Sequence, residues 1–539
     1  MRSRRRSLAA TLHGALHGVS LKQDLPRLRR ALSLLRQPPR PRPPRRRRAP
    51  AALLTEFLED PDSPVSVTEG ALLIAEESRP GLDIDAARRA LDELARELRP
   101  LIRRASGPDR ARILCRALFG NLGFTACDDR DLESPLALLL LPDVLERKRG
   151  HCLGLTTLLV ALGERLGIPL HAVSLPGHVF CRYDDRREVL NLETTLAGAE
   201  WSDARYVRRA RPQLVTDAEV SPELIAQLLE PLDARGLLVE ILNNRGNDFW
   251  RRGRQEDAAR DLIRATRARP DFARGHAGKG FLALCRGELD IALVELARAL
   301  ELDETDERSR LLLGEALLER GHYGRALDVL ELCAARRPES AFTRSLIGRA
   351  KARLGDIDGA REAHAEALRL DDAGGLVWNN VGVFLARTGE PEVAIDAFLK
   401  ALARAPELAA AAENLARLAR RRPELLDAEL RARIVTRLRD RLATARSPRG
   451  AALTLATFLL ESEGAVAEAR ELAERAHATK AAAASAELLA RIAWRERELI
   501  HARRRAIEGL ALLPGARLRR RLHRRLAKID RSLSLACGL

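Results

Sequence analysis

The sequence predicts an α+β domain with a helical N-terminal part, followed by an all-helical repeat solenoid. Between residues 149 and 195, one amphipathic helical segment precedes short strand-like segments separated by turns. Beyond residue 245, glycine and alanine recur with one fixed period. Only 3% of the 539 residues are aromatic and 46% are hydrophobic, with Ala and Leu dominant, a composition that suits closely packed helices.

Changes of pattern along the chain set the predicted domain limits. These are 1–50 for a basic tail and linker, 51–215 for the α+β domain, 230–425 for five repeats in register and a degenerate sixth, and 426–539 for further repeat-like helices with a basic C-terminal cap. Four or five helices are expected before the strands. One of them spans Asp85–Leu98, and we expect Pro100 to end it.

A helix is predicted from Cys152 to Leu166. Its apolar stripe consists of Leu155, Leu158, Leu159, Leu162 and Leu166. Gly167 and Pro169 follow as stop signals. Cys152 therefore lies at the N-terminus of a helix, where unpaired N–H groups and the positive dipole end favour a thiolate and lower the thiol pKa.

Two strands are predicted next, over 171–175 and 178–183, joined by a Pro176-Gly177 turn. Because side chains alternate along a strand, His178 and Cys181 lie on opposite faces. If His178 faces Cys152, Cys181 faces away, so Cys152 is the better candidate nucleophile.

A third strand, over 188–193, supplies the candidate for orienting the histidine. Asn191 and Glu193 are two residues apart and point the same way, so either could hold the His178 imidazole in the useful tautomer. Glu193 is preferred because a carboxylate also stabilises an imidazolium, and Asn191 is the alternative.

The second half of the chain repeats with a period of 34 residues. The glycines in step are Gly246, Gly280, Gly314, Gly348 and Gly382. A second glycine series and an alanine series keep the same spacing, and Pro270, Pro338 and Pro406 close three of the five units. This is the tetratricopeptide pattern, in which small residues let the two helices of a unit pack closely.

Four segments carry a family resemblance: FLEDPDSPVSVTEGALLIAEESRPGLDID at 57–85, LFGNLGF at 118–124, DVLERKRG at 143–150 and LGIPLHAVSLPGHVFCR at 166–182. With them, residues 52–210 resemble the transglutaminase-like branch of the papain-type fold. The similarity is to its SirB-one type, or second transglutaminase core, which often precedes tetratricopeptide repeats. The resemblance implies that Cys152 is the nucleophile, His178 the general base and Glu193 the orienting acid. Glu133-Ser134 stands where the family often has Asn-Ser.

Two readings of the front domain stay open. A Cys152–His178–Glu193 triad would make it a thiol protease, amidase or acyl transferase, with the repeats recruiting a protein substrate. Alternatively, the front domain is a fold without turnover and the protein is an interaction scaffold. In that case Cys152 is a small buried residue, and His178 is a hydrogen-bonded strand residue.

Positive charge is confined to the two ends of the chain. Residues 1–50 hold 15 Lys and Arg against one acidic residue, whereas residues 51–500 are net negative despite a net charge of +17 overall. The N-terminal segment reads as a solvated basic tail that could touch an anionic surface or nucleic acid weakly. Arg4-Arg5-Arg6 opens a segment too broken to be an export signal.

The concave face of the solenoid is expected to bind a protein or peptide. Asn243, Asn244 and Asn247 lie in the first unit, but Gly278 and Leu312 occupy the positions equivalent to Asn244 in the next two, so the ligand is unidentified. Seven cysteines without regular spacing argue against a disulfide framework, and no metal or cofactor is implied. With no apolar run of 18 residues, we expect no transmembrane segment and a cytoplasmic location.

Overall fold

The computed structural model describes residues 50–60, 65–127, 135–210, 221–252, 254–370, 374–405, 408–422, 424, 428–444, 448–479, 482–512 and 516–536. The predictions for the tail before residue 50 and for Glu133-Ser134 therefore lie outside the described residues. The chain divides into two compact units, Met1–Phe272 and Ala273–Leu539.

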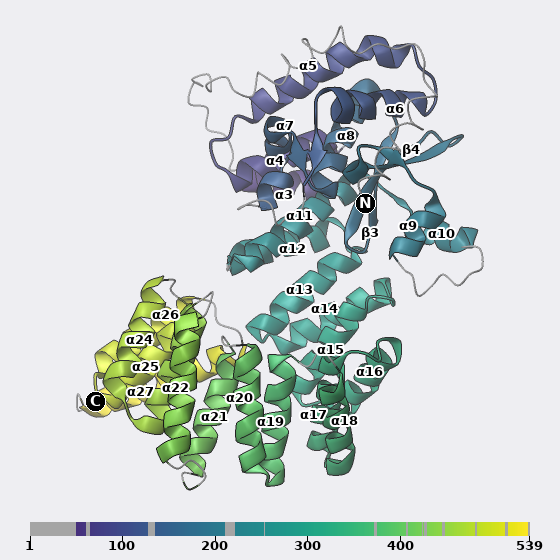
Figure 1. The fold of residues 1–539 in the computed structure, drawn as a ribbon. Helices are drawn as coiled ribbons and strands as arrows, with labels where there is room; N and C mark the ends of the chain where they lie inside the picture. The colour runs from purple at the N-terminus through teal and green to yellow at the C-terminus, as the bar shows by residue number, and fades with distance from the viewer. Residues whose placement is uncertain are drawn as a thin grey trace. The chain divides into compact units, whose positions relative to one another are not determined.

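The N-terminal unit combines helices with a small antiparallel sheet (Figure 1). Its helices are α3 Pro50–Glu59, α4 Val67–Ser78, α5 Ile84–Arg103, α6 Asp109–Cys115, the π-helix η2 Arg116–Asn121, the 3-10 helix η4 Pro135–Leu138, α7 Leu141–Arg147, α8 Cys152–Leu166, the 3-10 helix η5 Thr194–Leu196, α9 Asp203–Ala210, α10 Pro222–Leu228, α11 Ala234–Arg251 and α12 Gln255–Ala268. Its strands are β1 Thr125–Ala126, β2 Arg149–Gly150, β3 Leu170–Leu175, β4 His178–Asp184, β5 Val189–Glu193, β6 Ala199–Glu200 and β7 Pro231–Leu232.

Helix α8 has the predicted bounds and lies in the centre of the unit's core. It ends at Gly167, whose φ of 65° is the left-handed conformation that suits a glycine after a helix. Near that end, Glu164 accepts hydrogen bonds from the backbone N–H groups of Val67 and Thr68, so α8 caps the start of α4. The leucines of α8 pack with those of α4, α5 and α7 in one hydrophobic core.

The prediction that Pro100 ends its helix is wrong, because α5 continues to Arg103. Proline removes one backbone hydrogen bond within the helix. The additional turn, however, buries Ile102, which is only 1% exposed, in the core of the unit. This apolar burial offsets the loss of one bond close to the helix end.

The sheet has the strand order β6-β5-β4-β3-β7, and every neighbouring pair is antiparallel. The alternation predicted for β4 is confirmed. Val179 and Cys181 join the core that includes α8, while Phe180 joins a second cluster with Tyr206 of α9. The sheet is therefore covered on both faces, by α8 on one and by α9 and α10 on the other.

The helical pair α11–α12, predicted as the first repeat, packs against α4 and α3 within the N-terminal unit. A buried ion cluster fastens it there. Arg245 of α11 is 1% exposed and forms two hydrogen bonds to Asp261 of α12, at 2.7 and 2.6 Å. It also bonds to Glu77 and to the carbonyl of Ile74, both of α4.

The C-terminal unit consists entirely of helices within its described residues (Figure 1). They are α13 Ala273–Arg286, α14 Leu289–Leu302, α15 Glu307–Arg320, α16 Tyr323–Arg336, α17 Ala341–Leu354, α18 Ile357–Arg369, α19 Gly375–Thr388, α20 Pro391–Arg404, α21 Ala409–Arg421, α22 Ala428–Thr444, α23 Pro448–Phe458, the π-helix η8 Leu459–Glu463, α24 Val466–Thr479, α25 Ala483–Arg495, α26 Leu499–Ala511 and α27 Ala516–Ala536.

Antiparallel pairs of about 34 residues build the tetratricopeptide-like stack. A β-carbon on Gly280 of α13 would lie 2.6 Å from the Leu296 side chain of α14, so only glycine fits at this helix crossing. The first helices of successive pairs, α13, α15, α17, α19 and α21, pack against one another. Since the second helices of neighbouring pairs touch less closely, the first helices form the inner layer of the stack.

The last helix of the stack, α27, is joined to earlier helices by ion pairs. Arg521 lies 2.6 Å from Glu413 of α21 and 3.2 Å from Glu487 of α25. Leu522 and Ile529, both fully buried, pack the same helix against α25 and α26. In the part of the chain that the structure describes, none of the helices has both the length and the apolar character needed to span a bilayer.

Candidate functional site

Cys152 is the first residue of α8, as predicted, with its thiol at the positive end of the helix dipole. The preceding residue, His151, caps the helix: its Nδ1 accepts a hydrogen bond from the N–H of Gly154 at 3.4 Å. Burial alone would raise the pKa of the Cys152 thiol, but hydrogen bonds with His151 and His178 lower it to about 6. At neutral pH this side chain is therefore mainly a thiolate.

His178 is the first residue of β4, and only 10% of its side chain is exposed. Its Nε2 lies 2.7 Å from Oε2 of Glu193, which leaves Nδ1 as the ring nitrogen for the hydrogen bond with Cys152. Burial lowers the pKa of His178, but the hydrogen bonds with Cys152 and Glu193 outweigh this and raise it to about 9. Between about pH 6 and pH 9, thiolate and imidazolium therefore coexist.

Glu193 is fully buried at the end of β5. Burial raises its pKa, but hydrogen bonds from His178 and Thr195 lower it, and the net direction is down. Its Oε1 accepts from the backbone N–H of Thr195 at 3.0 Å and from the Thr195 hydroxyl. Its Oε2 accepts from the Tyr206 hydroxyl at 3.2 Å. The carboxylate thus has partners on both oxygens and is held charged beside the imidazole.

Asn191, the alternative orienting residue, lies in a different hydrogen-bond network. Its side-chain oxygen accepts from Arg182 at 2.8 Å, and its amide donates to Asp203 at 2.6 Å and to the Trp201 carbonyl at 3.1 Å. Of the two candidates, Glu193 therefore has the contact with His178, and Asn191 helps to fasten β5 to the start of α9.

Three further residues complete the site, and the sequence carries little signal of them. Tyr206 stacks on Phe180 with ring centroids 3.7 Å apart and bonds to Glu193, although it lies on a separate helix. Thr195 follows Glu193 in a Glu-Thr-Thr run that reads as an ordinary turn. His151 reads in the sequence as a mere neighbour of Cys152, yet it hydrogen-bonds the thiol.

Four of the other cysteines differ chemically from Cys152. Burial raises the pKa of Cys115 to about 12 and that of Cys285 and Cys333 to about 11. The fully buried Cys181 also has a raised pKa, as expected of a thiol that faces the core. Within the described residues, no group of three or more His, Cys, Asp or Glu side chains is arranged to hold a metal ion.

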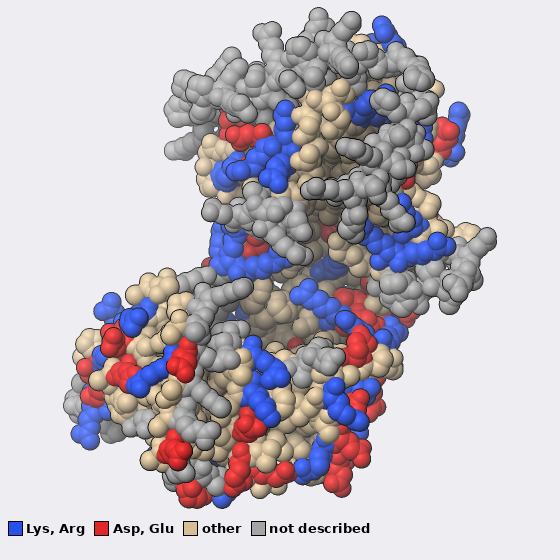
Figure 2. Space-filling model, in the orientation of Figure 1, with Lys and Arg blue, Asp and Glu red and all other residues tan. Residues whose placement is uncertain are grey.

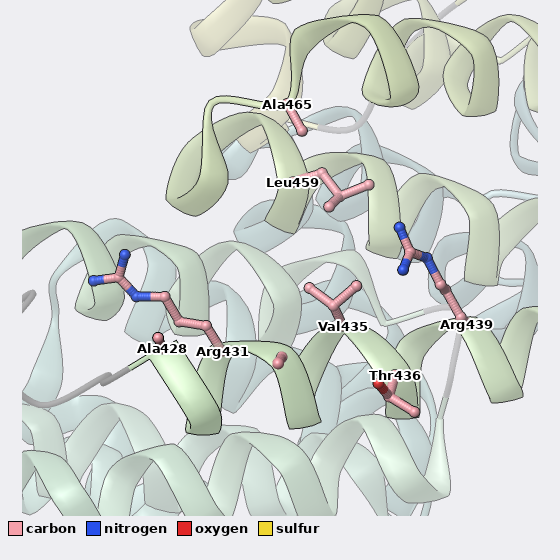
Figure 3. Close-up of a pocket in the computed structure, with 8 residues that line it drawn as sticks. Ala428, Arg431, Val435, Thr436, Arg439, Leu459 and Ala465 are labelled. Atoms are coloured by element: carbon pink, nitrogen blue, oxygen red, sulfur yellow. The ribbon is translucent and has the colours of Figure 1, made fainter.

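The C-terminal unit contains a hollow of about 560 Å³ between α22 and the helices that follow it (Figure 3). Its lining is Ala428, Arg431, Ala432, Val435, Thr436, Arg439, Leu459 and Ala465. The guanidinium of Arg439 lies 2.8 Å from Glu468, so its charge is already neutralised. The hollow is lined by both apolar side chains and the polar groups of Arg431, Thr436 and Arg439.

The inner layer of the repeats carries amide side chains in two consecutive pairs. Asn380 of α19 donates to the Ser345 hydroxyl of α17 at 3.2 Å, and Asn414 of α21 donates to the Asn379 side chain at 2.9 Å. Each amide keeps further hydrogen-bonding capacity beyond the bond described. These asparagines come later in the array than the three of the first repeat.

Comparison with known proteins gives one family match and several relatives. Residues 85–243 match the model of the transglutaminase-like superfamily. A UPF0162 protein of Pseudomonas aeruginosa strain PAO1 is 31% identical over 260 residues, which cover 48% of this chain and 91% of that protein. A UPF0162 protein of Xylella fastidiosa strain Temecula1 is 29% identical over 242 residues, covering 45% and 85%.

Solved structures of repeat proteins are similar to about a third of the chain. A thermophilic TPR protein of Thermus thermophilus matches with 21% identity and a TM-score of 0.30, covering 33% of this chain and 98% of that one. MamA of Desulfovibrio magneticus RS-1, from residue 41 to its end, matches with 23% identity and a TM-score of 0.28, covering 32% and 96%.

Proposed function

Because the chain belongs to the UPF0162 family and contains a transglutaminase-like domain, we propose that it is a cysteine-dependent amide or ester hydrolase or acyl transferase. The observation that supports this is the pair of opposite pKa shifts at one site, down to about 6 for Cys152 and up to about 9 for His178. An attacking group and a proton donor are thereby both in their working states at neutral pH.

The proposed reaction proceeds through a thioester. The Cys152 thiolate attacks the carbonyl carbon of an amide or ester, and the bond to the leaving nitrogen or oxygen breaks. His178, protonated at Nδ1, donates its proton to the leaving group, while Glu193 holds the imidazole through Nε2. Water or an amine, deprotonated by the now neutral His178, then attacks the thioester and releases Cys152.

The first residues of α8 offer a place for the negative charge of the tetrahedral intermediate. Backbone N–H groups in the first turn of a helix lack acceptors within the helix. Cys152 begins α8, so its own N–H lies beside the carbon that its sulfur attacks. Such donors stabilise charge that develops only during the reaction.

The helical repeats are proposed to recruit a protein or peptide. The amides of Asn380 and Asn414 on the inner layer are suited to bonding the backbone of an extended segment. In the competing function, a scaffold, the same layer binds a partner and the front domain does no chemistry.

The deciding experiment is the rate of Cys152 alkylation by iodoacetamide against pH, followed by peptide mass spectrometry. We expect a midpoint near pH 6 in the wild type and a rise of two or more pH units in His178→Ala. His171→Ala, on the neighbouring strand β3, serves as the control and keeps the wild-type midpoint. A midpoint near pH 9 that is the same in the wild type and in His178→Ala would exclude the enzyme and favour the scaffold.

A further inference from the structure

A cluster of exposed arginines adjoins the site on α9. The α9 arginine patch, as we name it, consists of Trp201 and the exposed side chains of Arg205, Arg208 and Arg209. Figure 2 shows Lys and Arg side chains gathered over the part of the N-terminal unit where Figure 1 draws α9. The proposed reaction has no role for these residues.

These arginines differ from most others on the surface. Many exposed arginines elsewhere, such as Arg96 with Glu93 and Arg89 with Asp83, are paired with carboxylates. Among the residues that the structure describes, no carboxylate pairs with Arg205, Arg208 or Arg209. The one acidic residue of α9, Asp203, is turned inward to Arg182 and Asn191. Within the described residues, no ion pair therefore neutralises the charge of the patch.

Aromatic stacking holds two of the guanidinium groups in place. The guanidinium carbon of Arg205 lies 3.7 Å from the centre of the Trp201 ring, and that of Arg209 lies 5.6 Å from it. A guanidinium stacked on an indole still has the N–H groups along its edge free to bond a carboxylate in the plane of the fork. Because the stack limits side-chain freedom beforehand, less entropy is lost on binding.

Tyr206 connects the patch to the thiol site. Its ring centroid lies 5.1 Å from that of Trp201 and 6.2 Å from that of His178, and its hydroxyl bonds to Glu193. Tyr206 itself is buried, so the two steps set an upper limit on the separation of the Trp201 and His178 rings. An extended peptide advances ~3.4 Å per residue, and that limit corresponds to about three residues of chain.

We propose that the α9 arginine patch binds an acidic stretch of the substrate polypeptide, within about three residues of the bond that Cys152 attacks. The proposal rests on the proposed thiol chemistry and adds the substrate class. Glu and Asp carboxylates bond the planar forks of Arg205 and Arg209, and Arg208 adds long-range attraction. Paired guanidiniums select a chain with two or more acidic residues over a neutral one.

The binding test uses the full chain with Cys152→Ser, so that no turnover consumes the probe. The probe is a fluorescein-labelled decapeptide of alternating Glu and Gly, and the Gln-Gly decapeptide is its neutral counterpart. By fluorescence anisotropy at 150 mM salt, we expect Arg205→Glu with Arg209→Glu to raise the Kd of the acidic probe at least tenfold. The lysine pair, Arg205→Lys with Arg209→Lys, keeps the charge without the fork, and we expect a rise of about threefold.

A second double variant tests whether the Kd of the acidic probe responds to net charge alone, as it would if the probe bound the basic tail. Arg103→Glu with Arg104→Glu reverses the same number of exposed charges at the end of α5 and is expected to change the Kd less than twofold. An equal loss in both double variants, or no loss in either, overturns the proposal. So does tighter binding of a ten-nucleotide single strand that depends on the same arginines.

A protection experiment separates this proposal from the proposed function. In the protein with Cys152 intact, the bound acidic probe is expected to slow Cys152 alkylation at least fivefold, and the Gln probe is not. If Cys152 has no low-pKa reactivity at all, the proposed function fails, while anisotropy still reports on the patch. If Cys152 is reactive but the acidic probe neither binds through α9 nor protects it, only the substrate class fails.

Discussion

The Tyr206 hydroxyl donates to Oε2 of Glu193 at 3.2 Å, the same carboxylate oxygen that lies 2.7 Å from Nε2 of His178. One atom of a buried acid is thus shared between the ring proposed to move protons and α9, the helix that covers the same face of the sheet. Because Tyr206 also stacks on Phe180, the position of Glu193 depends on how α9 packs against β4.

Replacing Glu193 by Gln tests the charge on the orienting residue. The amide keeps the shape but removes the carboxylate, so we expect the pKa of His178 to fall and that of Cys152 to rise. Alkylation of Cys152 should then reach half its maximal rate at least one pH unit above the wild-type midpoint. Asn191→Ser is the matched control two residues away, and a shift there as large as in Glu193→Gln would assign the orienting role to Asn191.

Tyr206→Phe separates the hydroxyl from the ring. Losing one hydrogen bond to a buried carboxylate is expected to cost about 1 kcal/mol of unfolding free energy in urea titrations. The alkylation midpoint of Cys152 should move by less than one pH unit, because Glu193 keeps Thr195 and His178 as partners. Tyr206→Ala also removes the stack on Phe180 and should cost about 3–5 kcal/mol. If Tyr206→Phe and Tyr206→Ala lose the same unfolding free energy, the hydroxyl and the ring do not contribute separately as expected.

Arg245→Met breaks the buried ion cluster between α4, α11 and α12. Asp261 would be left buried without its ion-pair partner, while Glu77 keeps the hydrogen bonds that Arg264 donates, and the expected destabilisation is about 3–5 kcal/mol by chemical denaturation. Asp261→Leu added to Arg245→Met should recover part of that loss. Arg96→Met, at an exposed ion pair of α5, should leave stability within experimental scatter. A loss no larger than that of Arg96→Met would contradict a structural role for the cluster.

His364 makes stability depend on pH. Burial lowers its pKa to about 4 from 6.5, so the folded protein resists protonation that the unfolded chain accepts. The unfolded state therefore binds more protons below pH 6.5, and stability falls between pH 6.5 and 4, by about 3 kcal/mol in total. In His364→Leu this slope should disappear from urea unfolding at pH 7, 6 and 5. Replacing the exposed His322 by Leu is the control and should leave the pH dependence of the unfolding free energy unchanged. If that pH dependence persists in His364→Leu, it comes from another group.

Local signals were sufficient for the helix and strands that form the site. Gly167 ends α8 where its apolar stripe stops, and Pro176-Gly177 separates β3 from β4, so the positions of Cys152 and His178 followed from spacing alone. The glycines at intervals of 34 residues predicted the helical pairs for the same reason: each signal comes from residues that lie near one another in the sequence.

Long-range contacts were not predictable in this way. Asn191 and Glu193 share a strand face, and the register of β5 against β4, which sets Asn191 opposite Arg182, gives one of them Arg182 as partner and the other His178. Tyr206 has no periodic signal, because its partners Phe180 and Glu193 lie on two different strands and not on its own helix. Similarly, α5 runs through Pro100 because the core beyond it has room for Ile102.

Because Arg245 fastens α11 and α12 within the N-terminal unit, the part of the array that is free of these contacts begins at α13. Whole pairs of 34 residues can be gained or lost after Phe272 without touching Glu77 or Asp261. A break before Ala234 would instead strip Leu237, Leu238, Ile241 and Leu242 from the core that contains α8. Gene rearrangements can therefore lengthen or shorten the repeat array while the thiol site stays folded.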